Sequence, residues 1–341
     1  MESVALAAPT GKAANRMEES IQNGLVAIPN RGETDEEILQ HLPEAKTLHR
    51  LLGYSSRMGG GKHHEKNPLA YEVVIVDEAS MIDLDLMDRL LRAVPIDAQL
   101  ILLGDADQLP SVDAGAVFRD LLPSLEAAPP DDPRKDASVV LTQSYRMDPA
   151  DPDGRTILMV AAHINAGQAK ALFDPDSTED GTITERAAVE DLTFRGVELV
   201  VDGNKTSKKN AFLERWFTDR VCSHMRFKEL TSRTYDFREL EPEKSDKLAL
   251  RELFKHANNH KILCVTTRDA EHVNAFLHQK TGSLNPGQVH NRAIATRFRP
   301  GESIMMLRND YERGLFNGDQ ALVLRVLTES GRARIAAVFP R

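Results

Sequence analysis

Residues 73–80 read Val-Val-Ile-Val-Asp-Glu-Ala-Ser, and this stretch decides the fold. Four β-branched apolar residues are followed at once by two acids, Asp77 and Glu78. A continuous apolar run of this kind predicts a central strand of a parallel sheet, because such strands are buried on both faces. The strand therefore brings two carboxylates to its carboxyl end, and residues 84–93 are expected to form the helix that follows.

Similar apolar runs lie before and after this strand. Val4–Ala8 ends at Pro9 and is followed by a helical pattern over residues 12–21. Leu100–Leu103 ends in a glycine and an aspartate, and Val139–Leu141 is a further candidate strand. Strands that alternate with helices predict a doubly wound α/β sheet, whose ligands bind beyond the carboxyl ends of the strands.

The remainder of the chain predicts a second α/β unit and a small all-β part. Residues 54–69 are expected to form a β-hairpin with Gly59–Gly61 at its tip, and residues 172–204 to form a linker. Ile262–Thr267 is predicted to be a buried strand. Helices are predicted over residues 157–165 (ended by Gly167), 211–225, 247–257 and 270–277. Short strands of a small β-barrel are predicted at Ile304–Leu307, Gln320–Val326 and Arg334–Val338.

Length and composition bound the class of protein. A chain of 341 residues exceeds one ordinary domain, so two or three packed units are expected. Hydrophobic residues make up 41% and charged residues 28%, and no apolar run is long enough to cross a bilayer. The first ten residues do not resemble a secretory signal. Cys222 and Cys264 are too few for a disulfide framework or a four-cysteine zinc site, so a reducing cytoplasm is expected.

Charge is distributed unevenly along the chain. The net charge of −9 argues against a basic coat over the whole surface, which is the usual mark of nonspecific nucleic-acid binding. Residues 46–66 nevertheless carry five lysines and arginines against one acid, and Arg292, Arg297 and Arg299 form a second basic group. These groups are either nucleic-acid contacts or two solvated loop faces.

The two acids at the end of the decisive strand fit the Walker B pattern of nucleotide-hydrolysing proteins. In that pattern the first acid, here Asp77, organises Mg²⁺, and the second, here Glu78, orients or deprotonates the attacking water. A helix N-cap after an ordinary strand is the alternative, because aspartate favours that position.

The neighbouring strand ends in a second polar turn, Gly104-Asp105-Ala106-Asp107-Gln108-Leu109-Pro110. The amide of Gln108 can donate to and accept from a terminal phosphate or a catalytic water, and so distinguish ATP from ADP. A polar turn closed by proline is the alternative. Two such strand ends in one sheet favour the nucleotide site over both alternatives.

Five segments extend this pattern along the chain. They are Ala8-Pro9-Thr10-Gly11-Lys12-Ala13-Ala14, Thr47-Leu48-His49-Arg50, Asp77-Glu78-Ala79-Ser80, Gly104-Asp105-Ala106-Asp107-Gln108 and Leu141-Thr142-Gln143-Ser144-Tyr145-Arg146. The first resembles motif Ia of superfamily 1 helicases, the second the DNA-contact segment after it, and the last three motifs II, III and IV. Together with residues 308–311 and 315–319, they are similar to the exodeoxyribonuclease V alpha-subunit (RecD-like) family, 5′-to-3′ helicases of a DNA-break-processing complex.

This resemblance implies a RecA-like P-loop NTPase core with a parallel sheet, a second RecA-like unit and a small SH3-like β-barrel insertion. The implied domains are residues 1–170 with a hairpin insertion at about 54–70, residues 171–290 with a linker, and residues 291–341. It also implies ATP and Mg²⁺ as cofactors, single-stranded DNA as a partner, and the beta and gamma subunits of exodeoxyribonuclease V as protein partners.

The resemblance also implies roles for individual residues. Arg146 is expected to act as an arginine finger on the terminal phosphate, and Tyr145 to pack against the nucleotide base. Gly104 and Asp105 are expected to contact the nucleotide, and Asp77 to bind Mg²⁺. The expected DNA contacts are Pro9, Thr10, Lys12, Thr47, His49 and Arg50.

Gly11-Lys12 does not complete a phosphate-binding loop. The G-x-x-x-x-G-K-[ST] pattern needs glycine where Leu6 stands and serine or threonine where Ala13 stands. No residue of this sequence is assigned to that loop or to motifs V and VI of the family. We therefore expect the 341-residue chain alone to hydrolyse ATP negligibly and not to unwind DNA. A nucleic-acid-binding or assembly module without ATP hydrolysis is the alternative function, and an ATPase that acts on protein ranks below it.

Overall fold

The structure is a computed structural model, and it describes residues 3–340 with internal gaps. The gaps are residues 55–60, 110, 112–114, 116, 127–128, 130, 133–136, 144, 146, 169, 174–182, 224–225, 240–242, 285–297 and 311. The chain divides into two compact units. Unit 1 comprises Met1–Thr142 and Met306–Gly318, and unit 2 comprises Gln143–Met305 and Asp319–Arg341.

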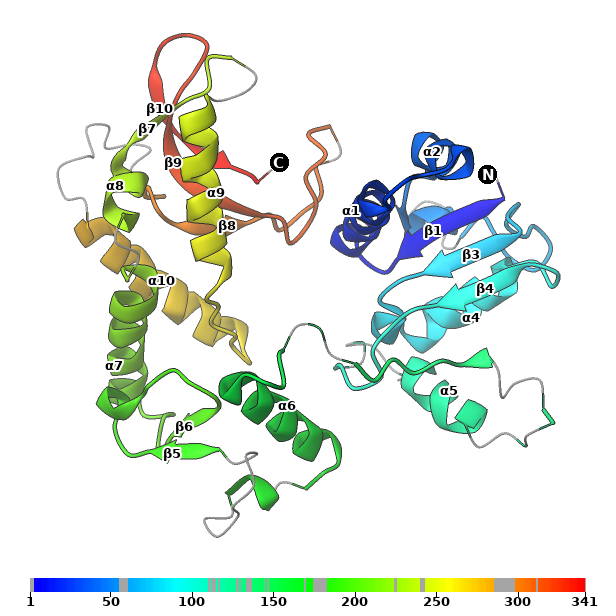
Figure 1. The fold of residues 1–341 in the computed structure, drawn as a ribbon, viewed down its shortest axis with the longest axis horizontal. Coiled ribbons are helices and arrows are strands. Elements are labelled where there is room, and N and C mark those ends of the chain that lie inside the picture. Colours follow the sequence, from blue (N-terminus) through cyan, green and yellow to red (C-terminus); the bar gives the residue numbers. More distant parts are fainter. Residues whose placement is uncertain are drawn as a thin grey trace. The chain divides into compact units, whose positions relative to one another are not determined.

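Unit 1 contains a four-stranded parallel sheet in the order β2-β1-β3-β4. The strands are β1 (Val4–Ala8), β2 (Lys46–Thr47), β3 (Val73–Val76) and β4 (Gln99–Leu102). Ala7 lies opposite Val76, which in turn lies opposite Leu102, so the strands end in register. Figure 1 shows β1, β3 and β4 side by side with α1 and α2 beside β1. The residues that follow the four strands therefore meet at one edge.

Helices cover both faces of this sheet. They are α1 (Gly11–Ala27), α2 (Glu33–Gln40), α3 (Leu48–Leu51), α4 (Leu84–Ala93) and α5 (Val117–Glu126), with a 3₁₀ turn at Ala79–Met81. Alternate residues of a strand point to opposite faces, so Leu6 and Ala8 pack with α1 while Ala5 and Ala7 pack with α3 and α4. This two-sided burial explains the unbroken apolar run in the sequence.

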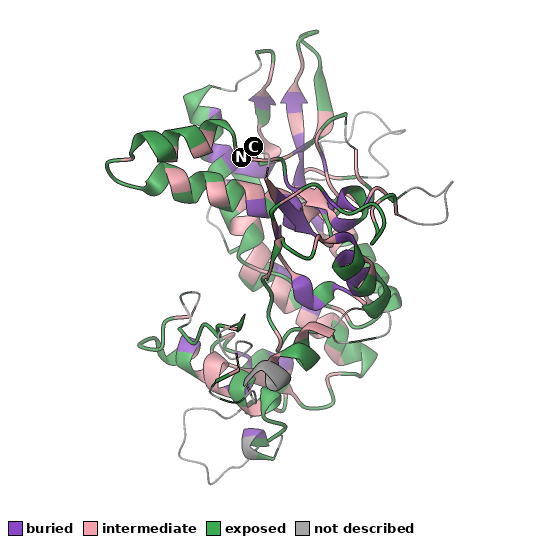
Figure 2. Cartoon of the chain, turned by 90° about the vertical axis from the view of Figure 1, so that its right-hand side faces the viewer, coloured by how far each residue is buried: buried purple, intermediate pink, exposed green. Residues whose placement is uncertain are grey.

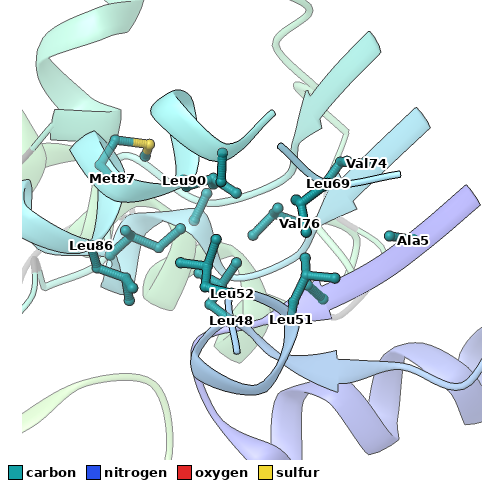
Figure 3. Close-up of a cluster of buried hydrophobic side chains, with 14 residues drawn as sticks. Ala5, Leu48, Leu51, Leu52, Leu69, Val74, Val76, Leu86, Met87 and Leu90 are labelled. Atoms are coloured by element: carbon teal, nitrogen blue, oxygen red, sulfur yellow. The ribbon is translucent and has the colours of Figure 1, made fainter. Parts of the chain in front are cut away.

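Helix α4 shows how the sequence specifies one of these layers. Asp83 caps it by accepting a hydrogen bond from the backbone N–H of Leu86 at 2.8 Å. Leu86, Met87 and Leu90 are buried together on one face of the helix and point toward the strands (Figure 3). Burying each such side chain contributes about 1.5–3 kcal/mol. The apolar face of α4 therefore packs the helix against β3.

Unit 2 contains a two-stranded parallel sheet and a mixed four-stranded sheet. In the second sheet β9 pairs antiparallel with β8 and β10 and parallel with β7. The strands are β5 (Thr184–Arg186), β6 (Glu198–Val200), β7 (Thr234–Asp236), β8 (Ser303–Met305), β9 (Gln320–Leu327) and β10 (Ala333–Val338). The helices are α6 (Pro152–Asn165), α7 (Thr206–Trp216), α8 (Phe227–Ser232), α9 (Lys244–Asn258) and α10 (Thr267–Leu284), and a π-helix covers Phe217–Val221. Tyr235 and Leu253 lie in the core between this sheet and its helices.

Most of the predicted elements are confirmed. The strand at Val73–Val76 and the helix at Leu84–Ala93 have the predicted bounds, and Gly167 follows α6 with a left-handed φ of 69°. The helix predicted over residues 12–21 is longer and runs to Ala27. In Figure 2 the strands are largely buried while many helical surfaces are exposed, as the apolar patterns indicated. No helix of the described residues has the length and apolar character needed to cross a membrane.

Two predicted strands are wrong. Val139–Leu141 and Ile262–Thr267 have no strand assignment; Leu141 is 90% exposed and Val265 fully exposed. An apolar β-branched run becomes a strand only when a neighbouring chain segment pairs with it, and no described segment does so here.

Three further predictions need correction. The small barrel is not confirmed, because β8, β9 and β10 share one sheet with β7. The hairpin predicted over residues 54–69 shows, among its described residues, only an isolated bridge between His64 and Asn67; Gly59 and Gly60 lie outside them. The predicted linker contains the paired strands β5 and β6. The two compact units divide at Thr142, and the named helicase domains, with their boundary near residue 170, stay a prediction.

Candidate functional site

The candidate site is the edge of the unit 1 sheet where all four strands end. Pro9 and Thr10 follow β1, and β2 ends in Thr47, which lies opposite Ala8. The acids Asp77 and Glu78 follow β3, and Leu103, Gly104 and Asp105 follow β4. Adjacent strands are about 4.8 Å apart, so the sheet order places the expected DNA contacts on one half of this edge and the expected nucleotide contacts on the other.

The acidic turn after β3 is held by backbone hydrogen bonds and is strained. The N–H of Asp77 donates to the carbonyl oxygen of Ala7 at 2.9 Å, and the N–H of Glu78 donates to Oδ1 of Asp77 at 2.8 Å. Glu78 has φ 54° and ψ 40°, a left-handed conformation that costs a residue other than glycine about 1–3 kcal/mol. This conformation ends the strand and keeps both acids at the edge of the sheet.

Helix capping does not explain Glu78. This residue precedes the 3₁₀ turn at Ala79–Met81, but its side chain makes no capping hydrogen bond there. The helix that follows is capped by Asp83 instead. The alternative explanation of the acids as an ordinary helix start therefore does not fit the geometry of Glu78.

The turn after β4 is closed by Asp105. Its Oδ1 accepts from the N–H of Asp107 at 3.0 Å, and its Oδ2 accepts from Nε2 of Gln108 at 3.3 Å. Both Asp105 and Gln108 are exposed. The polar turn that was the alternative for this segment is thus present, and it presents the amide of Gln108 at the same edge as Glu78.

Gly104 and Ser80 bring the two turns into contact. A Cβ atom on Gly104 would lie 3.0 Å from the backbone nitrogen of Ser80 and 3.1 Å from Cε1 of Phe118. The N–H of Ala79 donates to the carbonyl oxygen of Leu103 at 2.8 Å. The hydroxyl oxygen of Ser80 is buried without a hydrogen-bond partner among the described residues. Sequence patterns did not single out Ser80, because its burial depends on β4.

Thr10 and Thr47 have the same geometry on the other half of the edge. Oγ1 of Thr10 accepts from the N–H of Ala13 at 3.2 Å and caps α1. Oγ1 of Thr47 accepts from the N–H of Arg50 at 3.3 Å and caps α3. A hydroxyl that accepts a capping bond still has its own O–H to donate. Each threonine can therefore cap its helix and donate to a phosphate oxygen at once.

The remaining expected DNA contacts are partly engaged within the protein. His49 is exposed, with its ring centroid 5.0 Å from that of Tyr54. Arg50 forms an exposed ion pair with Glu44 at 3.5 Å. Nζ of Lys12 donates to the carbonyl oxygen of Gly318 at 2.5 Å. The structure thus distinguishes two threonines whose hydroxyl oxygens cap helices from side chains that contact other side chains or a distant carbonyl group of the protein.

Other predicted residues lie elsewhere. Tyr145 belongs to unit 2, is 86% exposed, and donates from its hydroxyl to Oε1 of Gln143 at 3.1 Å. Arg146 lies outside the described residues, as do Arg292 and Arg297. The roles of Tyr145 and Arg146 stay predictions. Arg299 donates through its backbone N–H to Glu302 at 2.9 Å.

Asp77 supplies one carboxylate for a metal ion. Among the described residues there is no group of three histidine, cysteine or acidic side chains that could hold a metal by themselves. Mg²⁺ is commonly held by one or two carboxylates together with water and the phosphates of a substrate. Asp77 therefore fits Mg²⁺ that arrives with a nucleotide.

Comparisons with known proteins agree with this geometry. The AAA domain family matches residues 1–114, which include β1 to β4. The chain is 48% identical over 126 residues to the RecBCD enzyme subunit RecD of Mycolicibacterium smegmatis, covering 36% of this chain and 22% of that protein. It is 30% identical over 322 residues to the ATP-dependent RecD2 DNA helicase of Deinococcus radiodurans, covering 94% of this chain and 32% of that protein. The chain thus spans at most about a third of these relatives.

A solved structure gives a weaker match. The crystal structure of Bacteroides sp Pif1 in complex with ADP-AlF4 is 18% identical, covers 98% of this chain and 64% of that chain, and has a TM-score of 0.31.

The parallel sheet, the two acids after β3 and the AAA-domain match define a RecA-like NTPase fold. Within that fold, the chain is similar to RecD and RecD2 proteins.

Proposed function

We propose that this chain forms part of an ATP-dependent 5′-to-3′ single-stranded DNA translocase or helicase that acts in double-strand break processing and recombination. The observation that carries the proposal is the order of the unit 1 sheet, which separates Thr10 and Thr47 on one half of the edge from Asp77 and Glu78 on the other. A translocase needs its nucleotide site and its DNA site on one rigid element, so that a conformational change at the nucleotide site alters the DNA site.

On the nucleotide half, each residue has a chemical task. Asp77 would hold Mg²⁺ bound to the nucleotide phosphates, and the ion would neutralise charge on the transferred phosphoryl group. Glu78 orients a water molecule and accepts its proton, and Gln108 donates its amide hydrogen to the terminal phosphate. Gly104 and Asp105 shape this turn. The resemblance assigns packing against the base to Tyr145 and stabilisation of developing negative charge to Arg146.

On the DNA half, phosphate contacts carry the binding. The hydroxyls of Thr10 and Thr47 donate to phosphate oxygens, with backbone N–H groups at the start of α1 as further donors. His49 and Arg50 are exposed beside Thr47 and add weaker, salt-dependent attraction. Such contacts carry no base preference, as a translocase requires. We propose single-stranded DNA, and the beta and gamma subunits of exodeoxyribonuclease V, as partners.

The test is single-stranded DNA-stimulated ATP hydrolysis by the protein expressed from its complete reading frame. Loss of a general base typically costs about 10²–10⁴-fold in rate, so Glu78→Gln is expected to lower ATP turnover by that amount while DNA binding persists. Glu185→Gln is the matched control, because Glu185 is an exposed glutamate in unit 2. Full turnover by Glu78→Gln would contradict the role of Glu78. DNA binding by the wild type without hydrolysis would favour the binding or assembly module.

A further inference from the structure

Residues 306–318, here called the clasp, lie between β8 and β9, and hydrogen bonds join the described residues of this segment, which are all but residue 311. Asp310 and Leu315 exchange backbone hydrogen bonds of 2.7 and 2.9 Å. The N–H of Gly318 donates to the carbonyl oxygen of Met306 at 2.8 Å, which closes the base of the loop. The N–H of Asn317 donates to Oδ1 of Asn309 at 2.7 Å, so the side chain of Asn309 shapes the turn. The clasp is therefore a preformed element.

The clasp belongs to unit 1 and packs on the first turn of α1. Gly11 is buried, and a Cβ atom there would lie 3.0 Å from Cδ1 of Phe316. Gly318 has φ 90°, and a Cβ atom on it would lie 3.0 Å from Cδ of Lys12. A glycine on each side thus permits an approach that side chains would prevent. Phe316 covers Gly11 while the preceding Thr10 remains exposed.

Lys12 joins α1 to the clasp by a hydrogen bond. Its Nζ donates to the carbonyl oxygen of Gly318 at 2.5 Å, across 306 positions of sequence. The side chain of Lys12 is only half-buried. An ammonium group has three N–H donors, and one of those of Lys12 is therefore engaged by the clasp.

We infer that Lys12 and Phe316 are positioning residues: they hold the clasp on α1 so that the exposed Thr10 hydroxyl faces a DNA phosphate, and Lys12 does not itself bind that phosphate. This inference rests on the proposed DNA contact of Thr10 and revises the direct contact expected for Lys12. Both ends of the clasp continue into strands of unit 2, β8 and β9. The clasp is thus covalently continuous with two strands of unit 2.

The test compares two variants that loosen the clasp in different ways. Lys12→Met keeps most of the aliphatic stem but removes the charge, whereas Gly11→Ala pushes against Phe316 without changing any charge. Two readouts are measured on each variant. The first is the affinity for a fluorescent oligo-dT strand over a series of salt concentrations. The second is the rate of trypsin cleavage after Arg308 and Arg313, which lie in the clasp.

Both variants are expected to speed cleavage after Arg308 and Arg313 by about tenfold and to weaken oligo-dT binding by a similar factor. The slope of log affinity against log salt is expected to stay unchanged. If Lys12 bound a phosphate directly, Lys12→Met would lower that slope by about 0.7, the value for one contact on a single strand, and leave the cleavage rate as in the wild type. That result, or unchanged cleavage in both variants, would overturn the inference.

Controls separate this inference from the proposed function. Lys228→Met removes an exposed lysine of unit 2 and is expected to change neither readout. Circular dichroism melting of each variant shows whether the protein as a whole has folded. If the wild type fails to bind oligo-dT, the proposed function fails, while the trypsin readout still decides whether Lys12 holds the clasp.

Discussion

The two halves of the sheet edge differ in backbone strain and in how fully their polar groups are hydrogen-bonded within the protein. On the half formed by β1 and β2, Thr10 and Thr47 each cap a helix. On the half formed by β3 and β4, Glu78 is left-handed and the hydroxyl of Ser80 is buried without a partner among the described residues. The first half is relaxed and the second is strained.

This difference fits the tasks proposed for the two halves. A strained backbone and a buried hydroxyl without a partner each cost about 1–3 kcal/mol. Groups held in this way are found at sites where a ligand or a second conformation offsets the cost. The half that is proposed to bind the DNA backbone needs no such feature, since the N-termini of capped helices already offer hydrogen-bond donors. We therefore expect ligand binding to change the conformation of the half that is proposed to bind the nucleotide.

The largest expected effect on stability is at Gly104. In Gly104→Ala the added Cβ would press on the backbone nitrogen of Ser80 at 3.0 Å, and we expect a loss of about 1–3 kcal/mol in the free energy of unfolding. Urea denaturation measures it. Gly24→Ala is the matched control: nothing lies within 4 Å of its Cβ position in α1, so it should stabilise by about 0.5–1 kcal/mol. Equal changes in the free energy of unfolding for the two substitutions would show that the close contact at Gly104 does not limit the side chain there.

A smaller effect is expected on the relaxed half. Thr10→Ala removes the cap of α1 and should cost about 1 kcal/mol of unfolding free energy. Thr10→Ser keeps the hydroxyl and should cost less. Thermal unfolding followed by circular dichroism gives the comparison. Equal melting temperatures for Thr10→Ala and the wild type would show that the cap contributes nothing.

The smallest effect, with the opposite sign, is expected at Ser80. Ser80→Ala removes a buried oxygen that lacks a partner, so the unfolding free energy should stay the same or rise by up to about 1 kcal/mol. Thr231→Val is the matched control: Oγ1 of Thr231 donates to the carbonyl oxygen of Phe227 at 2.8 Å, and its loss should destabilise by about 1 kcal/mol. Destabilisation by Ser80→Ala, measured in urea, would mean that its hydroxyl is satisfied.

How much of the fold the sequence predicts depends on what stabilises each element. Val73–Val76 was predictable because a strand covered on both faces must be apolar throughout, and α4 because its cap and apolar face are local. Val139–Leu141 and Ile262–Thr267 carry the same strand signal but have no described partner. Pairing is a property of two segments, and one segment does not encode it.

The candidate site likewise has features that the sequence predicts and features that it does not. The positions of Asp77 and Glu78 at a strand end follow from the sequence, as do Thr10 and Thr47 before helices. The left-handed conformation of Glu78 and the burial of Ser80 do not, because they depend on how closely β4 approaches. The hydrogen bond from Lys12 to Gly318 joins residues 306 positions apart, and no local pattern encodes it.

The most direct test of the divided edge measures two quantities on two variants of the protein expressed from its complete reading frame. These are the affinity for single-stranded DNA and the rate of ATP hydrolysis without DNA, for Glu78→Gln and Thr10→Val. The account predicts that Glu78→Gln loses hydrolysis by about 10²–10⁴-fold and keeps its DNA affinity. Thr10→Val should lose about tenfold or more in DNA affinity and keep its DNA-independent hydrolysis. Loss of both quantities in both variants would contradict the division of the edge into two halves.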